Sequence, residues 1–204
     1  IFGKLTIGSL VRCSQTVRKQ TNLYNNKEIQ MEAGAHGVAL IQHFEGCYSS
    51  VPNSAANGKI KPKPVSNLHN LEQTLYSYRC SANVPTIGWG NTKWTDGSPV
   101  QDGDECTLDD ANILFAQELA EFSHGVDKLL KAPVTQNQFD ALVSFCYNLG
   151  PANLKSSTLL KKVNANPNDP NIAQEFNKWV RGGGKVLPGL VNRRKSESEL
   201  YFKK

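Results

Sequence analysis

The feature that most constrains the fold is a long amphipathic stretch that begins at Thr107. Asp109 and Asp110 follow in what would be the first helical turn, where acidic side chains interact favourably with the helix dipole. Apolar residues then recur at helical spacing along one face: Leu108, Ala111, Phe115, Leu119, Phe122, Val126 and Leu129. The stretch therefore predicts a long helix with one buried face.

Further helices are expected on both sides of this one. The pattern turns helical from Ala33, and this first helix ends at Gly46, which places Glu45 at its C-terminus. Thr135 and Gln138 form a capping box, which opens a helix that ends at Gly150–Pro151. Shorter helices are predicted at Ser157–Asn164 and at Pro188–Phe202. Between them, Asn171 is expected to cap a helix with Ala173, Phe176 and Trp179, which Gly182–Gly183–Gly184 ends.

The segment between the first helix and the long helix has a different pattern. Tyr48 to Glu72 has little periodicity and reads as a basic surface loop, with a short helix near Leu68 to Leu75. Leu75 to Trp94 alternates around a turn at Ser81–Asn83, which predicts a small antiparallel hairpin or sheet; Thr95–Asp96–Gly97 is a second turn. The fold class is therefore α+β, with a small β-containing lobe, a larger helical lobe and a cleft between them.

Residues 1–30 differ from the rest, with strand-like residues at first and a polar stretch after them. We interpret them as an N-terminal extension or the end of a preceding module, and residues 31–204 as one catalytic domain.

Composition limits the partners. No run approaches the roughly 20 apolar residues that a membrane-spanning helix needs, so no stable membrane span is expected. The net charge of +5 suits any polyanion, but no nucleic-acid motif is present and no nucleic-acid partner is expected. The four histidines show no ligand spacing and the five cysteines form no CxxC pair, so neither a metal nor a cofactor is expected.

Glu45 is the first candidate for chemistry. A carboxyl group at a helix C-terminus faces the negative end of the dipole, and Phe44 could shield it from water. Both effects would raise its pKa toward the range of a general acid, although most glutamates at such positions are simply exposed.

The second candidate is the stretch from Pro85 to Thr92. Gly88 and Gly90 are costly in a strand and suggest close approach of another backbone or of a ligand. Trp89 between them could stack on a sugar ring or belong to the core.

Several segments occur in a characteristic order: His43–Phe44–Glu45–Gly46, Tyr78–Arg79–Cys80, Thr86–Ile87–Gly88–Trp89–Gly90–Asn91–Thr92, Gln136–Asn137–Gln138–Phe139–Asp140–Ala141–Leu142, Tyr147–Asn148–Leu149–Gly150, Ser157–Thr158–Leu159–Leu160 and Gly183 through Arg194. Together they resemble the phage-type lysozymes, glycoside hydrolase family 24, over about residues 33 to 203. Motifs in the same order are far more specific than any one of them.

The resemblance implies an N-acetylmuramidase that acts on bacterial peptidoglycan, with a catalytic Glu, Asp and Thr. Glu45 matches the Glu and Thr86 the Thr, but Cys80 stands at the place of the Asp. Some family members carry Cys there, and a thiolate beside Arg79 could position a water or attack the sugar. Cys80 could also be an inert thiol or be joined to Cys47 by a disulfide.

Further positions follow from the same resemblance. It implies that Tyr147, Asn148 and Ser157 bind saccharide, although Tyr147 and Asn148 could equally close their helix and pack the hinge between the lobes. Trp89 and Gly90 are the other candidates for saccharide binding. The family's usual link between the Glu and the Asp position is shorter, so residues of about 49–73 form an insertion, whose Lys59, Lys61 and Lys63 could contact anionic wall polymers or be solvated.

The expected protein is a monomer that acts on the bacterial cell wall, in the periplasm or outside the cell. It would be a phage-encoded lysis protein made in the host cytoplasm, or a secreted one. Two alternatives stay open: a lysozyme domain of a phage tail or secretion spike, and an inactive peptidoglycan-binding module, which the Cys80 departure motivates.

Overall fold

The computed structural model describes residues 30–50, 62–80 and 83–204. Met31–Lys204 form one compact unit, which is described here by itself. The expectations for residues 1–29, for Lys59 and Lys61 and for most of the Ser81–Asn83 turn fall outside the described residues.

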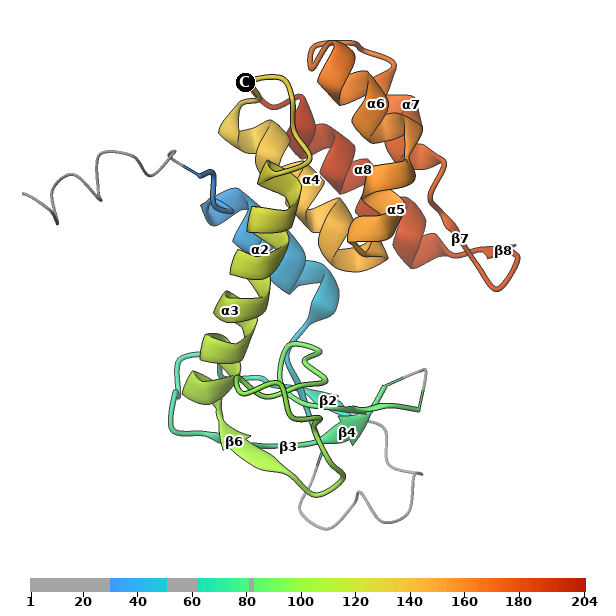
Figure 1. The fold of residues 1–204 in the computed structure, drawn as a ribbon. Coiled ribbons are helices and arrows are strands. Elements are labelled where there is room, and N and C mark those ends of the chain that lie inside the picture. Colours follow the sequence, from blue (N-terminus) through green and yellow to red (C-terminus); the bar gives the residue numbers. More distant parts are fainter. Residues whose placement is uncertain (1–29, 51–61, 81–82) are drawn as a thin grey trace, which may run out of the picture. The chain divides into compact units, whose positions relative to one another are not determined.

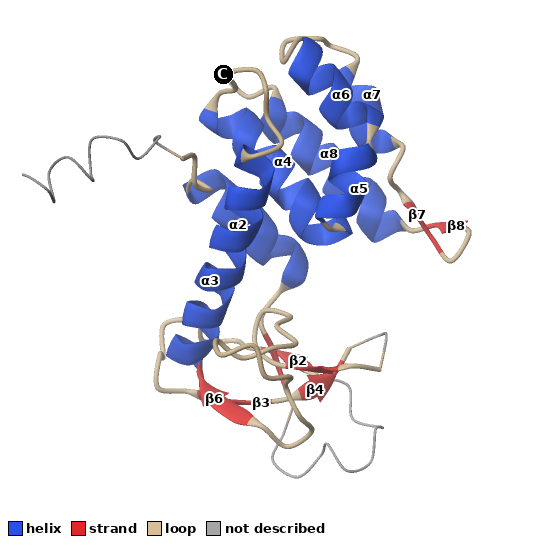
Figure 2. Ribbon diagram, in the orientation of Figure 1, coloured by secondary structure: helices blue, strands red, loops and turns tan. Residues whose placement is uncertain are grey.

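The compact unit combines a helical lobe with a lobe of short strands (Figures 1 and 2). Its elements are α2 (Ala35–Glu45), β1 (Tyr48–Ser49), β2 (Lys63–Pro64), β3 (Thr74–Tyr76), β4 (Tyr78–Arg79), β5 (Pro85–Thr86), β6 (Glu105–Thr107), α3 (Leu108–Asp127), α4 (Gln136–Leu149), α5 (Pro151–Ser156), α6 (Thr158–Ala165), α7 (Ile172–Asn177), β7 (Arg181–Gly182), β8 (Lys185–Val186) and α8 (Pro188–Tyr201). Strands β2, β3, β4 and β6 gather at the start of α3, and helices α4 to α8 lie toward its other end. The predicted α+β fold is confirmed.

Helix α3 matches its prediction closely. Thr107 caps it, with the Thr107 side chain accepting from the Asp110 backbone N–H and the Asp110 carboxylate accepting from that of Thr107. The predicted apolar stripe is buried except at Phe122 and Leu129, which are partly buried. The helix thus runs from the strand lobe into the core of the helical lobe.

Helix α4 is the centre of the helical lobe. Its capping box at Thr135 and Gln138 forms as predicted, and the helix ends at Gly150, where φ is +85°. It packs against α8, α2 and α3, and nine consecutive residues, Gln138 through Cys146, are buried. This all-round burial makes α4 the element on which the other helices are fixed.

The N-terminus of α2 is capped from α4. Gly34, at the N-cap, has no side chain that could accept a hydrogen bond from the first turn. The buried Asp140 carboxylate instead accepts hydrogen bonds from the backbone N–H groups of Gly34 and Gly37, at 2.8 and 2.9 Å. A Cβ on Gly37 would lie 2.9 Å from Asp140 Cγ, so the close approach of α2 and α4 requires a glycine there.

The strand lobe is built from two-stranded antiparallel pairs. Strand β4 pairs with β5 in the predicted hairpin, with Tyr78 opposite Thr86, and β3 pairs with β6. The turn at Thr95–Asp96–Gly97 also forms, with Gly97 donating to the Trp94 carbonyl at 2.9 Å. Leu75 and Ile87 are fully buried and give this lobe its share of the core.

Three expectations about local structure were wrong. The segment from Leu68 to Leu75 forms turns and then β3 rather than a short helix. Leu68 and Leu71 are exposed, so a helix there would lack a buried apolar face. Helix α7 ends at Asn177, before Trp179, and the side chain of Asn171 donates to Asp169 instead of capping that helix.

Several elements were not predicted, among them the β1–β2 pair in the segment expected to be a surface loop. A six-residue helix, α5, follows the Gly150 stop directly and begins at Pro151, which favours a helical first turn. Gly182 is the last residue of β7 and pairs with Lys185, and Gly183 and Gly184, both with positive φ, form the tip of the β7–β8 hairpin. In the described part of the chain, no helix is both long and apolar enough to cross a bilayer.

Candidate active site

Glu45 is the last residue of α2, and the chain reverses direction directly after it. Gly46 has a φ of +67°, and a Cβ on it would lie 2.6 Å from the Tyr48 ring. Only glycine fits this turn. Tyr48 then donates its backbone N–H to the Gly88 carbonyl at 3.0 Å, which ties the C-terminus of α2 to the strand lobe.

The segment Thr86–Asn91 brings its two glycines close to other elements. A Cβ on Gly88 would lie 2.7 Å from Ala111 Cβ on α3, so Gly88 allows close packing of the lobe against that helix. A Cβ on Gly90 would lie 3.9 Å from a carboxylate oxygen of Glu45. The sequence-based expectation of a close approach is therefore confirmed, and Gly90 borders the Glu45 carboxylate.

The β4–β5 hairpin carries Thr86 and Cys80. Thr86 is buried, and its hydroxyl donates to the Val84 carbonyl at 2.9 Å, which leaves its oxygen lone pairs as acceptors. Cys80 directly follows β4 and is partly buried. Burial first, and then the charges of Cys47, Cys80, Tyr48 and Glu45, raise the pKa of Tyr78, so Tyr78 lies within electrostatic reach of both Cys80 and Glu45.

Two alternatives for Cys80 can be compared with this geometry. Cys80 and Cys47 are not joined by a disulfide, and burial raises the pKa of the Cys47 thiol to about 12. The Arg79 guanidinium, expected to favour a Cys80 thiolate, pairs with Asp102 and donates to the Asn83 carbonyl at 2.7 Å. Its charge is therefore largely balanced by Asp102.

The strongest contact of the Glu45 carboxylate is with Arg193 of α8. Arg193 Nη1 donates to Glu45 Oε1 at 2.6 Å, with the Arg193 side chain only 4% exposed and that of Glu45 25% exposed. The guanidinium also lies 5.5 Å from the centre of the Phe44 ring. One carboxylate oxygen is thus held from within the protein while the side chain keeps access to solvent.

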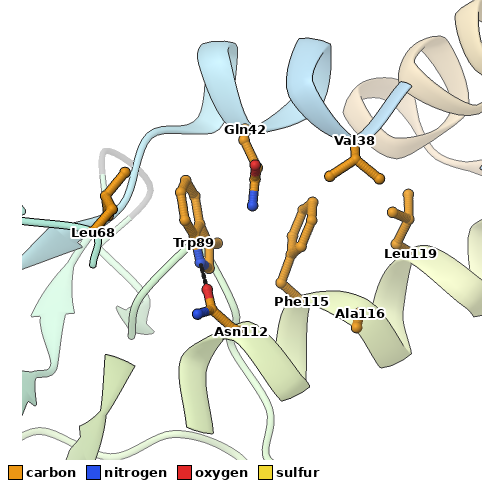
Figure 3. A pocket seen from close by; sticks show the side chains of 8 residues that line it. All are labelled: Val38, Gln42, Leu68, Trp89, Asn112, Phe115, Ala116 and Leu119. Atoms are coloured by element: carbon orange, nitrogen blue, oxygen red, sulfur yellow. Dashed lines mark hydrogen bonds between the residues drawn. The ribbon is translucent and has the colours of Figure 1, made fainter. Parts of the chain in front are cut away.

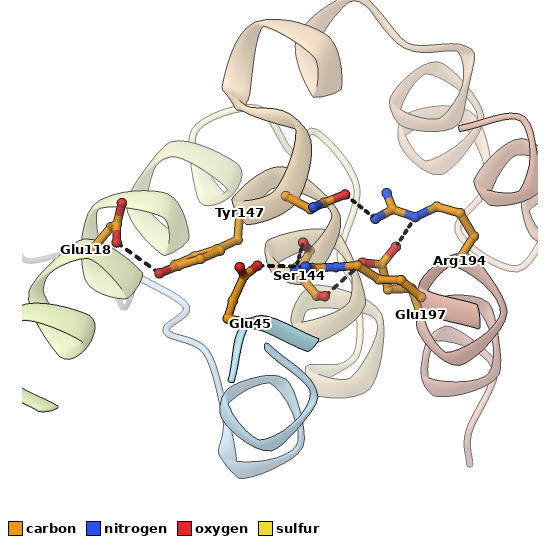
Figure 4. A network of polar contacts seen from close by, with 8 residues as sticks. Glu45, Glu118, Ser144, Tyr147, Arg194 and Glu197 are labelled. Carbon is orange, nitrogen blue, oxygen red and sulfur yellow. Dashed lines mark hydrogen bonds and ion pairs between the residues drawn. The ribbon is translucent and has the colours of Figure 1, made fainter. Parts of the chain in front are cut away.

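A second carboxylate, Glu118 of α3, lies near Glu45. Its Oε2 accepts from the Tyr147 hydroxyl of α4 at 2.9 Å (Figure 4). The same oxygen accepts from Asn91 Nδ2 of the strand lobe at 2.8 Å. Burial is the main cause that raises the pKa of Glu118; the two donors lower it and the charge of Glu45 raises it further. Glu118 therefore links both lobes next to Glu45.

Residues 71–197 match the family model described as phage lysozyme. The chain belongs to the phage lysozyme family. Among curated relatives, the endolysin of Bacillus phage B103 is 50% identical over 138 residues, which is 68% of this chain and 51% of that protein. The endolysin of Salmonella phage P22 is 33% identical over 130 residues, 64% of this chain and 88% of that protein.

The fold of solved family members agrees. The endolysin from Escherichia coli O157:H7 phage FAHEc1 aligns with a TM-score of 0.65 at 32% identity, over 84% of this chain and 94% of that one. The muramidase domain of SpmX from Asticaccaulis excentricus aligns with a TM-score of 0.64 at 28% identity, over 86% and 100%. The chain spans about half the length of the Bacillus phage relatives it matches.

The other expected site residues of this phage lysozyme domain lie in different places. Tyr147 and Asn148 lie at the end of α4, where Tyr147 bonds Glu118 and Asn148 accepts from Arg194 at 2.7 Å. Ser157 is buried, and its hydroxyl caps α6 and donates to the Leu154 carbonyl at 2.7 Å. That hydroxyl is thus already engaged by the backbone.

Trp89 lines a hollow of its own. The hollow measures about 350 Å³ and lies between α2, α3 and the loops, lined by Val38, Gln42, Leu68, Trp89, Asn112, Phe115, Ala116 and Leu119 (Figure 3). Trp89 is only 4% exposed and its indole N–H donates to Asn112 at 2.9 Å. The hollow includes none of Glu45, Thr86 or Cys80.

Sequence reasoning missed Arg193 and Glu118. Glu118 lies outside the apolar stripe of α3 and looked like an ordinary exposed residue. Arg193 is in a segment that the family resemblance did include, but no role was expected for it there. An Arg–Arg pair followed by Glu197 at helical spacing was the available signal, because such spacing permits ion pairs on one face.

Proposed function

We propose that this chain is a peptidoglycan hydrolase that cleaves the β-1,4 bond between N-acetylmuramic acid and N-acetylglucosamine. The observation that carries the proposal is the position of Glu45 at the end of α2, held by Arg193 and bordered by Gly90. Family membership supports the reaction class, since the matching relatives are named endolysins. The site of action would be the bacterial cell wall.

Cleavage of a glycoside needs a proton on the leaving oxygen and a group that attacks the anomeric carbon from the opposite face. Glu45, in its protonated form, gives its proton to the bridging oxygen as the bond from that oxygen to the anomeric carbon breaks. The partial exposure of Glu45 gives the sugar access to it, and Arg193 then stabilises the carboxylate that remains.

The attacking group is proposed to come from the β4–β5 hairpin. Because the Thr86 hydroxyl donates to the Val84 carbonyl, its lone pairs can accept a hydrogen bond from a water. Cys80, as thiolate, takes the second proton of that water as its oxygen bonds to the anomeric carbon, which inverts the configuration. Direct attack by the Cys80 sulfur would instead give a thioglycoside intermediate and, after hydrolysis, retention.

Saccharide contacts are proposed at Gly90, Tyr147 and Asn148, the expected residues that lie around Glu45 and its partners. Trp89 and Ser157 are proposed to support the site without contacting the reacting bond. Trp89 lines its hollow and Ser157 caps α6. Residues 1–30 are proposed to be an extension or linker, and the greater length of the Bacillus phage relatives is consistent with a domain of a larger protein.

Product analysis tests the proposal. Purified peptidoglycan is digested, and the mass and anomeric configuration of the fragments are determined. Fragments that end in reducing N-acetylmuramic acid support the assigned bond, and their initial anomer separates a Thr86-held water from attack by Cys80. Fragments that end in N-acetylglucosamine or in cleaved peptide would contradict the proposed bond.

A second candidate function is an inactive peptidoglycan-binding module, which the cysteine at the usual place of the Asp favours. It predicts wall binding without any release of fragments, by the wild type and by Glu45→Gln alike. Co-sedimentation with purified walls, run beside the digestion, distinguishes the two.

A further inference from the structure

Behind Glu45 lies a buried charged cluster, of which the catalytic scheme uses only Arg193. It consists of Arg193, Arg194 and Glu197 of α8 with Ser144 of α4, all of them buried (Figure 4). The spacing of the three charged residues places them on one helix face, and that face is turned toward α4. Burying three charged side chains on one helix face costs desolvation free energy, unless they form ion pairs with one another.

Each side chain in the cluster contacts at least one other, although Arg194 Nη1 has no hydrogen-bond partner among the described residues. Glu197 Oε1 accepts from Ser144 Oγ at 2.8 Å and from Arg193 Nε at 3.2 Å, and Glu197 Oε2 lies 3.1 Å from Arg194 Nε. Arg193 Nη2 donates to the Ser144 carbonyl at 3.2 Å. With Nε and Nη2 held in this way, Arg193 presents Nη1 to Glu45 in one fixed direction.

The charges in the cluster balance only with Glu197. Arg193 and Arg194 carry two positive charges, and the carboxylates within reach are Glu45 and Glu197. When Glu45 carries a proton, as the acid role requires, Glu197 is the carboxylate that still offsets one of the two guanidinium charges. Arg194 also lies 4.9 Å from the centre of the Phe145 ring, which further disperses its charge.

We propose that Glu197 is a positioning residue, which holds the Arg193 guanidinium on Glu45 and balances the buried arginine charge so that Glu45 can exist in its protonated form. This inference rests on the proposed function, because it concerns the same acid. Burial raises the pKa of the Glu197 carboxyl, while Arg194, Arg193 and the Ser144 hydroxyl act in the opposite direction. Two guanidiniums at 3.1 and 3.2 Å stabilise the ionised form.

Other titratable groups face Glu45 and stay constant in the experiment. They are Glu118 on α3, Tyr147 on α4 and Tyr78 on β4, each of which interacts electrostatically with Glu45. The charged groups that act on Glu197 are Arg193 and Arg194 of its own helix. Substitution at 194 or 197 therefore changes the charge behind Glu45 and leaves the other neighbours in place.

The test compares the pH dependence of kcat/KM for wall hydrolysis in the wild type, Glu197→Gln, Arg194→Gln and the double variant. Loss of Glu197 leaves excess positive charge, which favours the ionised form of Glu45. The alkaline limb of the profile, where activity falls as Glu45 loses its proton, should therefore move to lower pH by about 0.5–1 pH unit. Arg194→Gln should move this alkaline limb the other way. The double variant, which again has balanced charge, should return it to the wild-type position.

Glu199→Gln is the matched control, because Glu199 is on the same helix, exposed, and 3.9 Å from Lys195. Its alkaline limb should not move. An unchanged limb in a folded Glu197→Gln, or a double variant displaced as far as Glu197→Gln, would overturn the proposal. If Glu197→Gln does not fold, the pH profile of Arg194→Gln is the deciding measurement. An alkaline limb at the wild-type pH in that variant would overturn the proposal as well.

A second measurement does not depend on hydrolysis. The titration midpoint of the Glu45 carboxyl, followed by carbon-detected NMR, should move in the same directions in the same variants. Should the wild type release no fragments while these midpoints move as expected, the proposed function fails and the positioning role stands. Should fragments be released while the midpoints stay fixed, the positioning role fails alone.

Discussion

Arg193 and Glu45 lie 148 residues apart in the chain, and their side chains meet at 2.6 Å. This contact joins the end of the first helix of the compact unit to the last helix, and it closes a cluster that also includes Glu197 and Ser144. The orientation of the proposed acid therefore depends on the packing of α8 against α4.

Arg193→Lys should destabilise the protein although it keeps the charge. A lysine cannot serve Glu45, Glu197 and the Ser144 carbonyl at once, since it lacks the planar fork of donors. The free energy of unfolding in urea should fall by about 2–4 kcal/mol, as for other broken buried pairs. Arg181→Lys, at an exposed hairpin position, should change it by less than about 0.5 kcal/mol. Equal values for the two variants would mean that Arg193 is not held as described.

Glu118 should make stability depend on pH. Its pKa is raised above 4.5 in the folded protein, so the native state holds this proton more tightly than the unfolded chain does. From pH 4.5 up to the raised pKa, this group makes the free energy of unfolding fall as the pH rises. Glu118→Gln cannot titrate, so the stability of the variant relative to the wild type should increase between about pH 4.5 and pH 7.5.

Urea unfolding at the two pH values measures this difference. Glu199→Gln, an exposed position on α8 whose charge is not among those that act on Glu118, provides the baseline and should show no such trend. A Glu118→Gln difference that stays constant or declines toward pH 7.5 would contradict the raised pKa.

Gly37→Ala should be destabilising in spite of the better helix propensity of alanine. The new Cβ would lie 2.9 Å from Asp140 Cγ, and that carboxylate also caps α2, so either the helices or the cap must shift. We expect a loss of about 1–3 kcal/mol in unfolding free energy. Gly125→Ala in α3, with nothing within 4 Å of its new Cβ, should instead gain about 0.5–1 kcal/mol. A gain in unfolding free energy at both positions would show that α2 and α4 leave room for a Cβ at Gly37, contrary to the structure.

The features that the sequence predicted well are encoded by neighbouring residues. Both capping boxes, the Gly46 stop and the stripe on α3 depend on spacings of a few residues, and each is found in the structure. The β4–β5 hairpin is likewise local. The position of Glu45 at a helix end followed from such local signals.

The features that were missed depend on contacts between distant residues. Asp140 caps α2 across 106 residues, and Arg193 reaches Glu45 from the far end of the chain. A charged helix gives no sign of which charges are buried until its partner helix is known. The predicted helix near Leu68 failed for the same reason, because nothing near it in the sequence shows that Leu75 pairs with Cys106 in a strand.

The role of Cys80 can be tested by restoring the usual carboxylate. Cys80→Ala should lower the rate of wall hydrolysis by about 10²-fold or more, and Cys80→Asp should recover most of the loss, because a carboxylate can also hold and deprotonate a water. Cys106→Ala should leave the rate unchanged, since burial raises the pKa of that thiol to about 12 and keeps it from reacting. Full activity in Cys80→Ala would remove Cys80 from the mechanism.

The proposed acid is tested most directly by the rate at which reducing ends are released from purified peptidoglycan by the wild type and by Glu45→Gln. The wild type should release them steadily, and Glu45→Gln should be slower by about 10²–10⁴-fold while it unfolds at a similar urea concentration. Glu121→Gln should match the wild type. A folded Glu45→Gln that releases reducing ends as fast as the wild type would contradict the account.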